Sequence, residues 1–499
     1  MRHSILGLLL ISNAALSPAA AQERAAESLL ARALGETPIA TDLQELSDTI
    51  GGRPTGSPAL DRAVEWGAAK FKAAGLDDVR LESYVAPGLW LPGVETGVVT
   101  QPRYPLAPEN ELRVAAMPFS SSTRSSGVEA EVIAVGSGDE AAFAAAGERV
   151  RGRWILVHTE PMQSLEDLFR EYLDTPPCLA RARQHGAAGI LWMSTHSRRL
   201  LYRHNATLDG SLYTLPGAVV EREGALRTER LLSSGRTVRV KLRLQSTYAK
   251  ETTMRNVVAE IRGREKPAET VILGAHLDSW DLGRGALDNG CNVALVLDVG
   301  RQMMALAREG TRPRRSVRFV LYTGEEAGLF GSWGEVRNHR ADLDRVKAQV
   351  IFDIGTGHTS GFSLGGREDL RAAADAALAP AVGLGPFTHT ADAFVGTDNY
   401  DYMLEGVPTL VANQDGTPYL PEYHAESDTY DKADLRQLMA NAAIAAVLVW
   451  GLAEMAEDPA PRQSRTEIEA MTQATGLREQ MQAYGLWDDF VAAKRGRMP

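Results

Sequence analysis

The sequence predicts an α/β protein whose mixed, mostly parallel sheet is flanked by helices, with a smaller α/β domain inserted into it. Three observations predict this class. After Thr253, short apolar strand candidates alternate with helical stretches, as in a sheet covered on both faces. Histidine and acidic residues follow the ends of several of these strands. Residues 127–245 have a strand and helix rhythm of their own and lack this pairing of histidine with acids.

The bulk composition is that of an ordinary globular protein. The 499 residues are 44% hydrophobic and 23% charged, and they carry a net charge of −11. This acidic balance, without a basic stripe, argues against a nucleic-acid partner. Cys178 and Cys291 are the only cysteines, too few for a disulfide framework or a thiolate metal site, so we expect free thiols.

The N-terminus is typical of an exported protein. A basic start precedes an apolar stretch from Ile5 to Leu16, and small residues follow as far as Ala21. This pattern predicts a signal peptide over residues 1–21, cleaved after Ala21, and a secreted or periplasmic mature chain. The apolar stretch is too short to span a bilayer, and no other stretch qualifies, so we expect no stable membrane anchor.

Residues 22–126 are expected to hold the N-terminal part of the larger domain and a connecting segment. Ser57 and Pro58 are typical of a helix start and Gly75 of a helix end, which predicts a helix between them. Residues 79–85 are predicted to form a strand. From residue 86 to residue 126 the chain is rich in Pro, Gly and Ser, which indicates a domain boundary or an excursion of the chain.

The inserted domain is expected over residues 127–245. Its strand candidates are VEAEVIAV, RWILVHT, AAGILWM and TVRVKLRL. We expect it to have a structural or substrate-shaping role and to supply no metal ligand.

The larger domain is expected to continue over residues 246–460. Its strand candidates are NVVAEI, TVILGA, SVRFVLY, QVIFD and PTLVAN, and its helix candidates span residues 292–308, 368–378 and 435–455. Residues 461–499 are charged and predict a C-terminal helical arm.

One stretch of the larger domain, AHLDSWDLGRGALDNG at residues 275–290, places many acids against the end of an apolar run. His276, Asp278, Asp281 and Asp288 lie within thirteen positions. Carboxylates this close repel one another and lose hydration when partly buried, so we expect a positive partner among them. Asp and Gly are also ordinary turn residues, and this is the simpler explanation for Asp281.

Further potential ligands follow other strands of the same domain. Glu325 and Glu326 follow one strand, Asp353 ends another, and His424 lies in the loop after a third. In open α/β sheets, ligands bind outside the carboxyl ends of the strands. Histidines and carboxylates without cysteine suit zinc, and also cobalt or manganese. In aminopeptidases, two such ions about 3.5–4 Å apart polarise a carbonyl and activate a bridging water, whose proton a general base removes.

Six motifs follow one another along the chain: HLDSWD, ALDNG, TGEEAG, FDIGTG, GTDN and YHAESDTYDK. In this order they resemble the M28 family of co-catalytic zinc exopeptidases. The resemblance covers nearly the whole mature chain and implies a protease-associated (PA) domain where residues 127–245 stand. It also implies two zinc ions per chain, a peptide substrate and a homodimer.

The resemblance implies five metal ligands. His276 and Asp353 would hold one zinc ion, Glu326 and His424 the other, and Asp288 would bridge both.

Two further roles and one backbone feature come from the same resemblance. Glu325 matches the general base, and Asp278 matches the acid that orients His276. A cis peptide bond between Asp288 and Asn289 is implied as well.

Four residues are candidates for substrate binding. Asp398 and His389 lie before the last strand and either line the pocket or are structural. Tyr423 either contacts the reacting substrate or packs beside the site. Arg284 lies close to Asp288, where it would shape the pocket.

The favoured function is an exported two-zinc exopeptidase that hydrolyses dipeptides or short peptides, with Glu325 activating the water. An aminopeptidase of the same family is the alternative, because it shares the metal chemistry. A receptor-like protein on this fold and acyl transfer at a one-metal site are disfavoured, since the ligand set and the base are complete.

Overall fold

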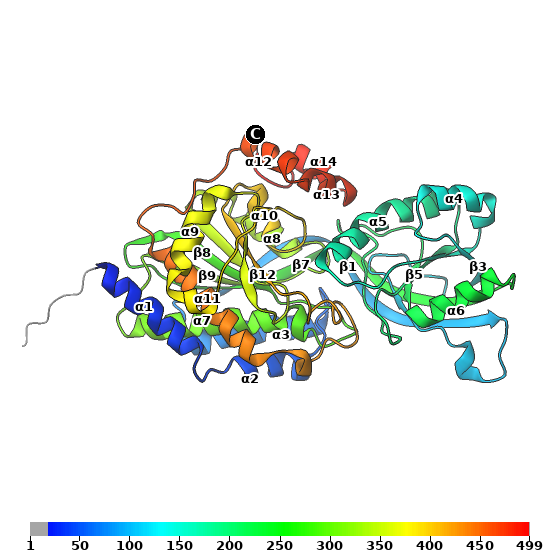
Figure 1. The fold of residues 1–499 in the computed structure, drawn as a ribbon, viewed down its shortest axis with the longest axis horizontal. Helices are drawn as coiled ribbons and strands as arrows, with labels where there is room; N and C mark the ends of the chain where they lie inside the picture. The colour runs from blue at the N-terminus through cyan, green and yellow to red at the C-terminus, as the bar shows by residue number, and fades with distance from the viewer. Residues whose placement is uncertain (1–17, 499) are drawn as a thin grey trace, which may run out of the picture.

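A larger lobe and a smaller lobe, joined by a long antiparallel ribbon, make up the computed structural model, which describes residues 18–498 (Figure 1). The apolar stretch of the predicted signal peptide lies outside these residues. The first described helix is α1 (Pro18–Ala33), so the predicted cleavage site after Ala21 lies within it.

The sheet of the larger lobe is mixed and mostly parallel, as predicted. Its strand order is β11-β12-β10-β8-β9-β7, in which the four central strands are parallel and the two outer ones run antiparallel to their neighbours. The strands are β7 (Arg239–Ile261), β8 (Lys266–His276), β9 (Arg315–Tyr322), β10 (Val346–Ile351), β11 (Thr359–Ser363) and β12 (Thr409–Gln414).

Helices cover both faces of this sheet because its strands are apolar on both sides. Val271 and Leu273 of β8 belong to one buried cluster, with helices α7 (Cys291–Arg308) and α11 (Leu435–Glu454). Ile272, between them in the chain, belongs to a cluster with helices α8 (Phe330–Asn338) and α10 (Tyr400–Leu404). This alternation follows from the two-residue period of a strand.

The remaining helices of this lobe are α2 (Ile39–Gln44), α3 (Pro58–Ala74) and α9 (Arg371–Leu378). Helix α3 begins and ends as predicted. The Ser57 hydroxyl accepts a hydrogen bond from the Leu60 N–H at 3.2 Å, and Gly75 ends the helix with a φ of 75°.

Helix α11 corrects the expectation that no stretch beyond the N-terminus qualifies as a membrane helix. It is long and apolar enough to cross a bilayer, but 72% of its apolar window is buried inside the fold. It packs against α1, α7 and α9 and against β8. We therefore assign α11 to the core of the larger lobe.

The ribbon between the lobes consists of β7 and strand β1 (Asp78–Gln101). The predicted strand over residues 79–85 is only the beginning of β1. Residues 86–101 continue this strand, so the stretch that was interpreted as a boundary or an excursion begins as an excursion toward the smaller lobe. The Pro-rich stretch remains a strand because its backbone pairs with β7. Prolines are tolerated in β1 because it is an edge strand. The two predicted strands TVRVKLRL and NVVAEI are likewise parts of the single strand β7.

The smaller lobe is built on the distal half of the ribbon. Its strands are β2 (Val114–Ala116), β3 (Val128–Ala134), β4 (Trp154–Val157), β5 (Gly189–Met193) and β6 (Gly217–Val220), and its helices are α4 (Glu140–Ala146), α5 (Leu165–Gln184) and α6 (Arg222–Ser233). Strands β3 to β6 are parallel, and β2 pairs antiparallel with β6. Because of this pairing, the sheet of the smaller lobe includes residues before 127.

The C-terminal arm is helical, as predicted. It consists of α12 (Arg465–Ala474), α13 (Leu477–Ala483) and α14 (Trp487–Val491), which lie over the larger lobe at the top of Figure 1. Helix α13 also contacts α5 of the smaller lobe.

Candidate metal centre

The candidate ligands gather at one edge of the larger sheet because the parallel strands end there. His276 is the last residue of β8, and Asp353 follows β10 by two positions. Glu325 and Glu326 follow β9, and His424 lies in the loop after β12. Parallel strands present their carboxyl ends at a common edge, so distant parts of the sequence meet there.

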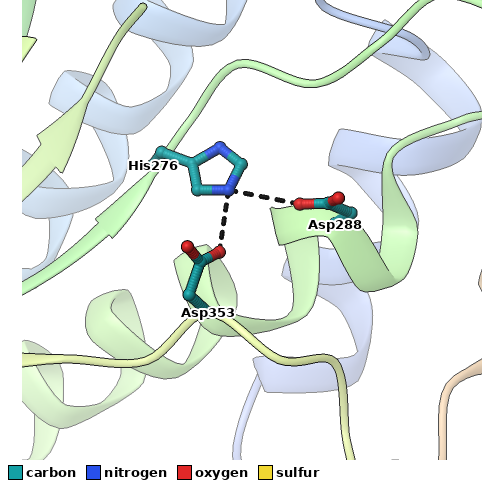
Figure 2. Close-up of side chains that lie close together, drawn as sticks. All are labelled: His276, Asp288 and Asp353. Atoms are coloured by element: carbon teal, nitrogen blue, oxygen red, sulfur yellow. Dashed lines mark hydrogen bonds and ion pairs between the residues drawn. The ribbon is translucent and has the colours of Figure 1, made fainter. Parts of the chain in front are cut away.

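The first group of side chains consists of His276, Asp288 and Asp353 (Figure 2). His276 Nε2 lies 2.8 Å from an oxygen of Asp353 and 3.2 Å from Oδ1 of Asp288. All three side chains are buried or nearly so. Their donor atoms lie within 4.8 Å of one another, close enough to bind one ion.

The second group consists of Asp288, Glu326 and His424. His424 Nε2 lies 2.9 Å from Oε2 of Glu326 and 3.3 Å from Oδ2 of Asp288. Asp288 thus turns one carboxylate oxygen to each histidine. This is the arrangement that a carboxylate needs to bridge two ions.

The electrostatics of the site are unfavourable without a cation. Burial raises the pKa of Glu326 well above its usual range, and the nearby Asp288 charge raises it further. Burial also raises the pKa of Glu325 and that of Asp353. Among the described residues, Oε1 of Glu326 is buried without a hydrogen-bond partner. Two imidazoles and three carboxylates, with no thiolate, are a donor set that fits zinc.

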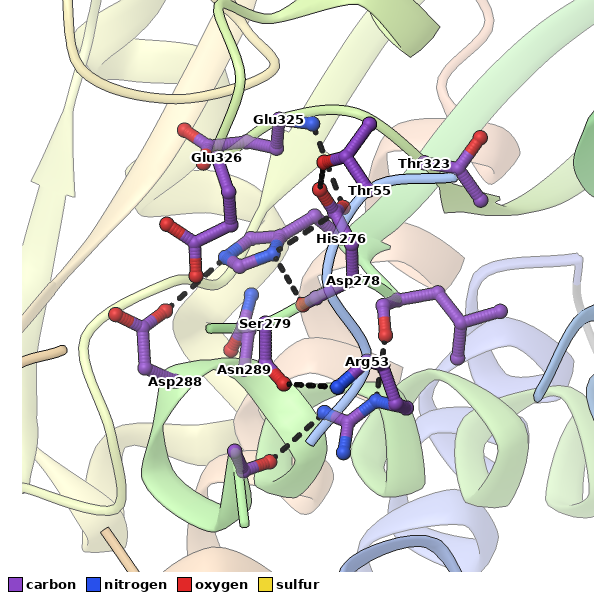
Figure 3. A network of polar contacts seen from close by, with 12 residues as sticks. Arg53, Thr55, His276, Asp278, Ser279, Asp288, Asn289, Thr323, Glu325 and Glu326 are labelled. Atoms are coloured by element: carbon purple, nitrogen blue, oxygen red, sulfur yellow. Dashed lines mark hydrogen bonds and ion pairs between the residues drawn. The ribbon is translucent and has the colours of Figure 1, made fainter. Parts of the chain in front are cut away.

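His276 is oriented by residues close to it in the chain. Its Nδ1 lies 3.0 Å from the backbone oxygen of Asp278 and 3.7 Å from the carboxylate of the same residue. That carboxylate accepts hydrogen bonds from the Thr55 hydroxyl at 2.6 Å and from the Glu325 N–H at 3.3 Å (Figure 3). Asp278 therefore connects the first histidine with the backbone of the candidate base.

His424 is oriented by the smaller lobe instead. Its Nδ1 lies 3.0 Å from the backbone oxygen of Arg203, and the Arg203 N–H donates to the His424 carbonyl at 3.1 Å. His424 has a left-handed φ of 54°, which is uncommon outside glycine. The two hydrogen bonds hold the histidine in this conformation.

The side chain of Arg203 is buried and fastens this contact. Its guanidinium donates to both oxygens of Asp281, at 2.9 and 2.8 Å, and to Glu95 at 2.7 Å. Asp281 thereby has a partner that the sequence did not reveal, because Arg203 belongs to the inserted segment. The pair links the loop after β8 to the smaller lobe.

Asp428 and Arg53, which sequence reasoning missed, hold the loop that carries Asp288. Asp428 accepts hydrogen bonds from the N–H groups of three successive residues, Ala286, Leu287 and Asp288. Burial raises the pKa of Asp428 to about 7. Arg53 is buried and donates to four backbone carbonyls of this region, among them those of residues 277 and 285. The position of Asp428 in the motif around His424 was the available signal.

Asp288 itself has two notable local features. The peptide bond between Asp288 and Asn289 is cis, as the resemblance implied. The hydroxyl of Tyr419 donates to Oδ2 of Asp288 at 2.9 Å.

A pocket opens beside the two groups. Glu325, Glu326, Asp353 and His424 lie at its polar end, and most of the other lining residues are apolar or aromatic. Tyr423 lines it, stacks on the ring of His424 at a centroid distance of 3.7 Å and shares a hydrogen bond with Tyr172. Tyr423 therefore lies at the site, which is consistent with both of its predicted roles.

The other three substrate candidates do not line the pocket. Arg284 is exposed and its guanidinium lies beside Gly51, because the loop turns this side chain outward. His389 is tied to the far strand β11, where its Nδ1 accepts the Phe362 N–H at 3.1 Å. Asp398 is fully buried, one residue beyond the lining residue Thr397.

Comparison with known proteins agrees with this geometry. Residues 256–449 match the model of peptidase family M28. The chain is 28% identical over 415 residues to carboxypeptidase Q of Bos taurus, which covers 83% of this chain and 84% of that one. The match to carboxypeptidase Q of Mus musculus is 29% identical and covers 83% of this chain and 85% of that one.

Solved structures share the fold. A peptidase M28 precursor from Shewanella amazonensis superposes with a TM-score of 0.80 and 26% identity, over 89% of this chain and 99% of that one. A zinc aminopeptidase from Bacillus subtilis superposes with a TM-score of 0.64 over 86% and 97%, and its 17% identity shows likeness of fold alone.

Proposed function

Because this chain belongs to peptidase family M28, we propose that it is an exported two-zinc exopeptidase that hydrolyses dipeptides and short peptides. The observation that carries the proposal is the position of Asp288, whose two oxygens face two separate pairs of histidine and acid. A single-metal site would need only one of these pairs.

His276 and Asp353 would hold one zinc ion, Glu326 and His424 would hold the other, and Asp288 would be shared. When bound, the two ions would polarise the scissile carbonyl and lower the pKa of the attacking water.

Glu325 is proposed as the general base. It lines the pocket beside the two groups and is not part of either. Its carboxylate is free to take the proton of the water and to pass it to the leaving amine. The Asp278 carboxylate holds the Glu325 N–H, so the base is positioned by the same acid that lies beside His276.

The pocket favours recognition of the amino end of the substrate. Among the described lining residues there is no lysine or arginine that would bind a free α-carboxylate. The name of the relatives, carboxypeptidase Q, instead supports recognition of the carboxyl end of longer peptides. A dipeptide presents both ends, and we propose dipeptides with a free amine as the common substrate.

Matched peptides test the proposal. We expect the purified, zinc-loaded protein to cleave Leu-Gly and Leu-Gly-amide and to leave N-acetyl-Leu-Gly intact. Cleavage of the acetylated peptide together with loss of activity on the amide would show carboxyl-end recognition instead. A protein that cleaves none of the three with zinc present is not the exopeptidase proposed here.

We also propose that the chain is exported and forms a homodimer. The residue pattern at positions 1–21 supports export, and resemblance to the family supports the dimer. Mass spectrometry of the mature chain and sedimentation equilibrium test these two points separately.

A further inference from the structure

The pocket beside the metal centre has three walls, and one of them is the C-terminal arm. Leu168 and Phe169 of α5 form the wall from the smaller lobe, and Ile354 and Phe394 belong to the larger lobe. Tyr484 and Leu486, between α13 and α14, form the third wall.

The arm is packed firmly enough to act as a wall. Tyr484 and Leu486 are 8% and 3% exposed and belong to a buried cluster with Leu329 and Val395 of the larger lobe. Tyr172 and Leu208 of the smaller lobe pack against the same cluster. The arm therefore joins the two lobes across the pocket.

Polar contacts with the larger lobe fix the position of the arm. Arg495 donates to both oxygens of Asp401, at 2.7 and 2.8 Å, and both side chains are buried. The side-chain oxygen of Gln480 accepts the Val395 N–H at 3.0 Å, so the arm also holds a loop that lines the pocket. Buried ion pairs with two hydrogen bonds set geometry well.

The lining chemistry defines what the pocket accepts. Among the described lining residues the charged groups lie only at the metal end, and the surfaces from α5, from the Phe394 loop and from the arm are apolar or aromatic. Phe169 and Phe394 contact each other with ring centroids 5.5 Å apart and close one side. Such a surface suits an uncharged, bulky side chain, since burial of a charge there would be costly.

We propose that the C-terminal arm is a specificity-determining wall, in which Tyr484 and Leu486 set the size of the apolar side chain that the substrate places beside the cleaved bond. The proposal rests on the peptidase function proposed above. It gives the arm a role in substrate selection, and the catalytic groups act independently of it.

Filling the pocket from the arm tests the proposal. We expect Leu486→Trp to lower kcat/KM for Phe-Gly by about 10-fold or more relative to Ala-Gly, because a pocket discriminates about 10–200-fold for small changes in apolar volume. Leu486→Ala should shift the same ratio toward the larger substrate. Gln482→Trp is the matched control, since it adds the same side chain at an exposed position of the arm and should leave the ratio unchanged.

The outcomes separate this proposal from the function itself. Equal loss for both peptides in Leu486→Trp, with an unchanged melting temperature, would overturn the role of the arm while the peptidase function stands. If the wild-type protein cleaves no peptide, calorimetry with phenylalanine amide replaces turnover. Binding by the wild type and the Gln482→Trp control, lost in Leu486→Trp, then supports the wall, and equal binding by all three overturns it.

Discussion

The two halves of the candidate metal centre use the same residue types but are supported by different parts of the chain. On one side, the second nitrogen of His276 faces Asp278, two positions further along the chain. On the other side, the second nitrogen of His424 faces the backbone of Arg203, 221 positions away and in the smaller lobe. The inserted lobe therefore orients the histidine of the His424 half, whereas the His276 half is oriented by its own strand end.

This asymmetry has a physical basis in the sheet. His276 ends a central strand with neighbours on both sides, so its backbone is fixed by the ladder. His424 lies in a long loop after β12 with a left-handed backbone, and such a loop needs support from elsewhere. Partners that orient a metal-binding histidine typically alter metal affinity by about 10–100-fold when they are lost.

The largest effect is expected where the two halves meet. Asp288→Ala removes the carboxylate that both share, so both ions should bind weakly and activity should fall below that of any single-half variant. Metal content by mass spectrometry, measured together with turnover, checks this. Retention of two ions per chain and of activity would contradict a bridging role for Asp288.

The adjacent acids come next. Glu325→Gln should lower kcat by about 10²–10⁴ while both ions stay bound, because it removes only the base. Glu326→Gln is the matched variant one position along, and it should lose the ion of the His424 half and recover in part with added zinc. If Glu325→Gln loses metal and Glu326→Gln keeps two ions without activity, the roles are reversed.

Arg203→Met should weaken the support that the smaller lobe gives to His424. We expect about 10–100-fold weaker zinc binding at the His424 half, with the His276 half unchanged, since the backbone oxygen that holds the ring of His424 loses the side-chain bonds to Asp281 and Glu95 that fix its position. Stepwise zinc titration resolves the two affinities. Arg151→Met, at an exposed position of the same lobe, is the control.

A second variant tests whether the weaker zinc binding of Arg203→Met comes from general unfolding. Asp281→Asn keeps the shape but weakens the ion pair that fastens Arg203, and it should reproduce the effect in milder form. Equal loss of both ions in Arg203→Met and in Asp281→Asn would show that the smaller lobe supports the whole site rather than one half.

Thr55→Val is expected to have the smallest effect and to act on the other half. It removes the hydrogen bond to Asp278, which lies one step away from His276, so activity should fall by about 10-fold or less and zinc binding should weaken at the His276 half. Thr100→Val, on the ribbon and away from the site, is the control. A larger loss at the His424 half would contradict the division between the halves.

Much of the site could be predicted from the sequence because its residues follow recognisable strands. The apolar runs before His276, Glu325 and Asp353 mark strand ends, and the topology of a parallel sheet brings those ends together. The motifs then supplied the roles of the ligands.

The residues that support the ligands could not be predicted in this way. Arg203 contacts the ring of His424 through its own backbone carbonyl, and Arg53 donates to backbone carbonyls of a distant segment. No local pattern in the sequence marks such contacts. Arg284 lies outside the pocket that it was expected to shape, and His389 has the structural one of its two predicted roles. Proximity in sequence to Asp288 or to a strand does not fix the direction of a side chain. The length of β1 was missed because its prolines are tolerated only by virtue of its edge position.

The ribbon of β1 and β7 also determines the order in which the chain can fold. Asp78 pairs with Glu260 and Gln101 with Arg239, so the whole smaller lobe is synthesised between the two strands. At a synthesis rate of about 5–20 residues per second, β1 waits on the order of ten seconds for its partner. Strands β3 to β6 are made within that interval and pair with one another in chain order. The smaller lobe is therefore synthesised before β7, and the strand ends that carry the candidate metal ligands are synthesised after it.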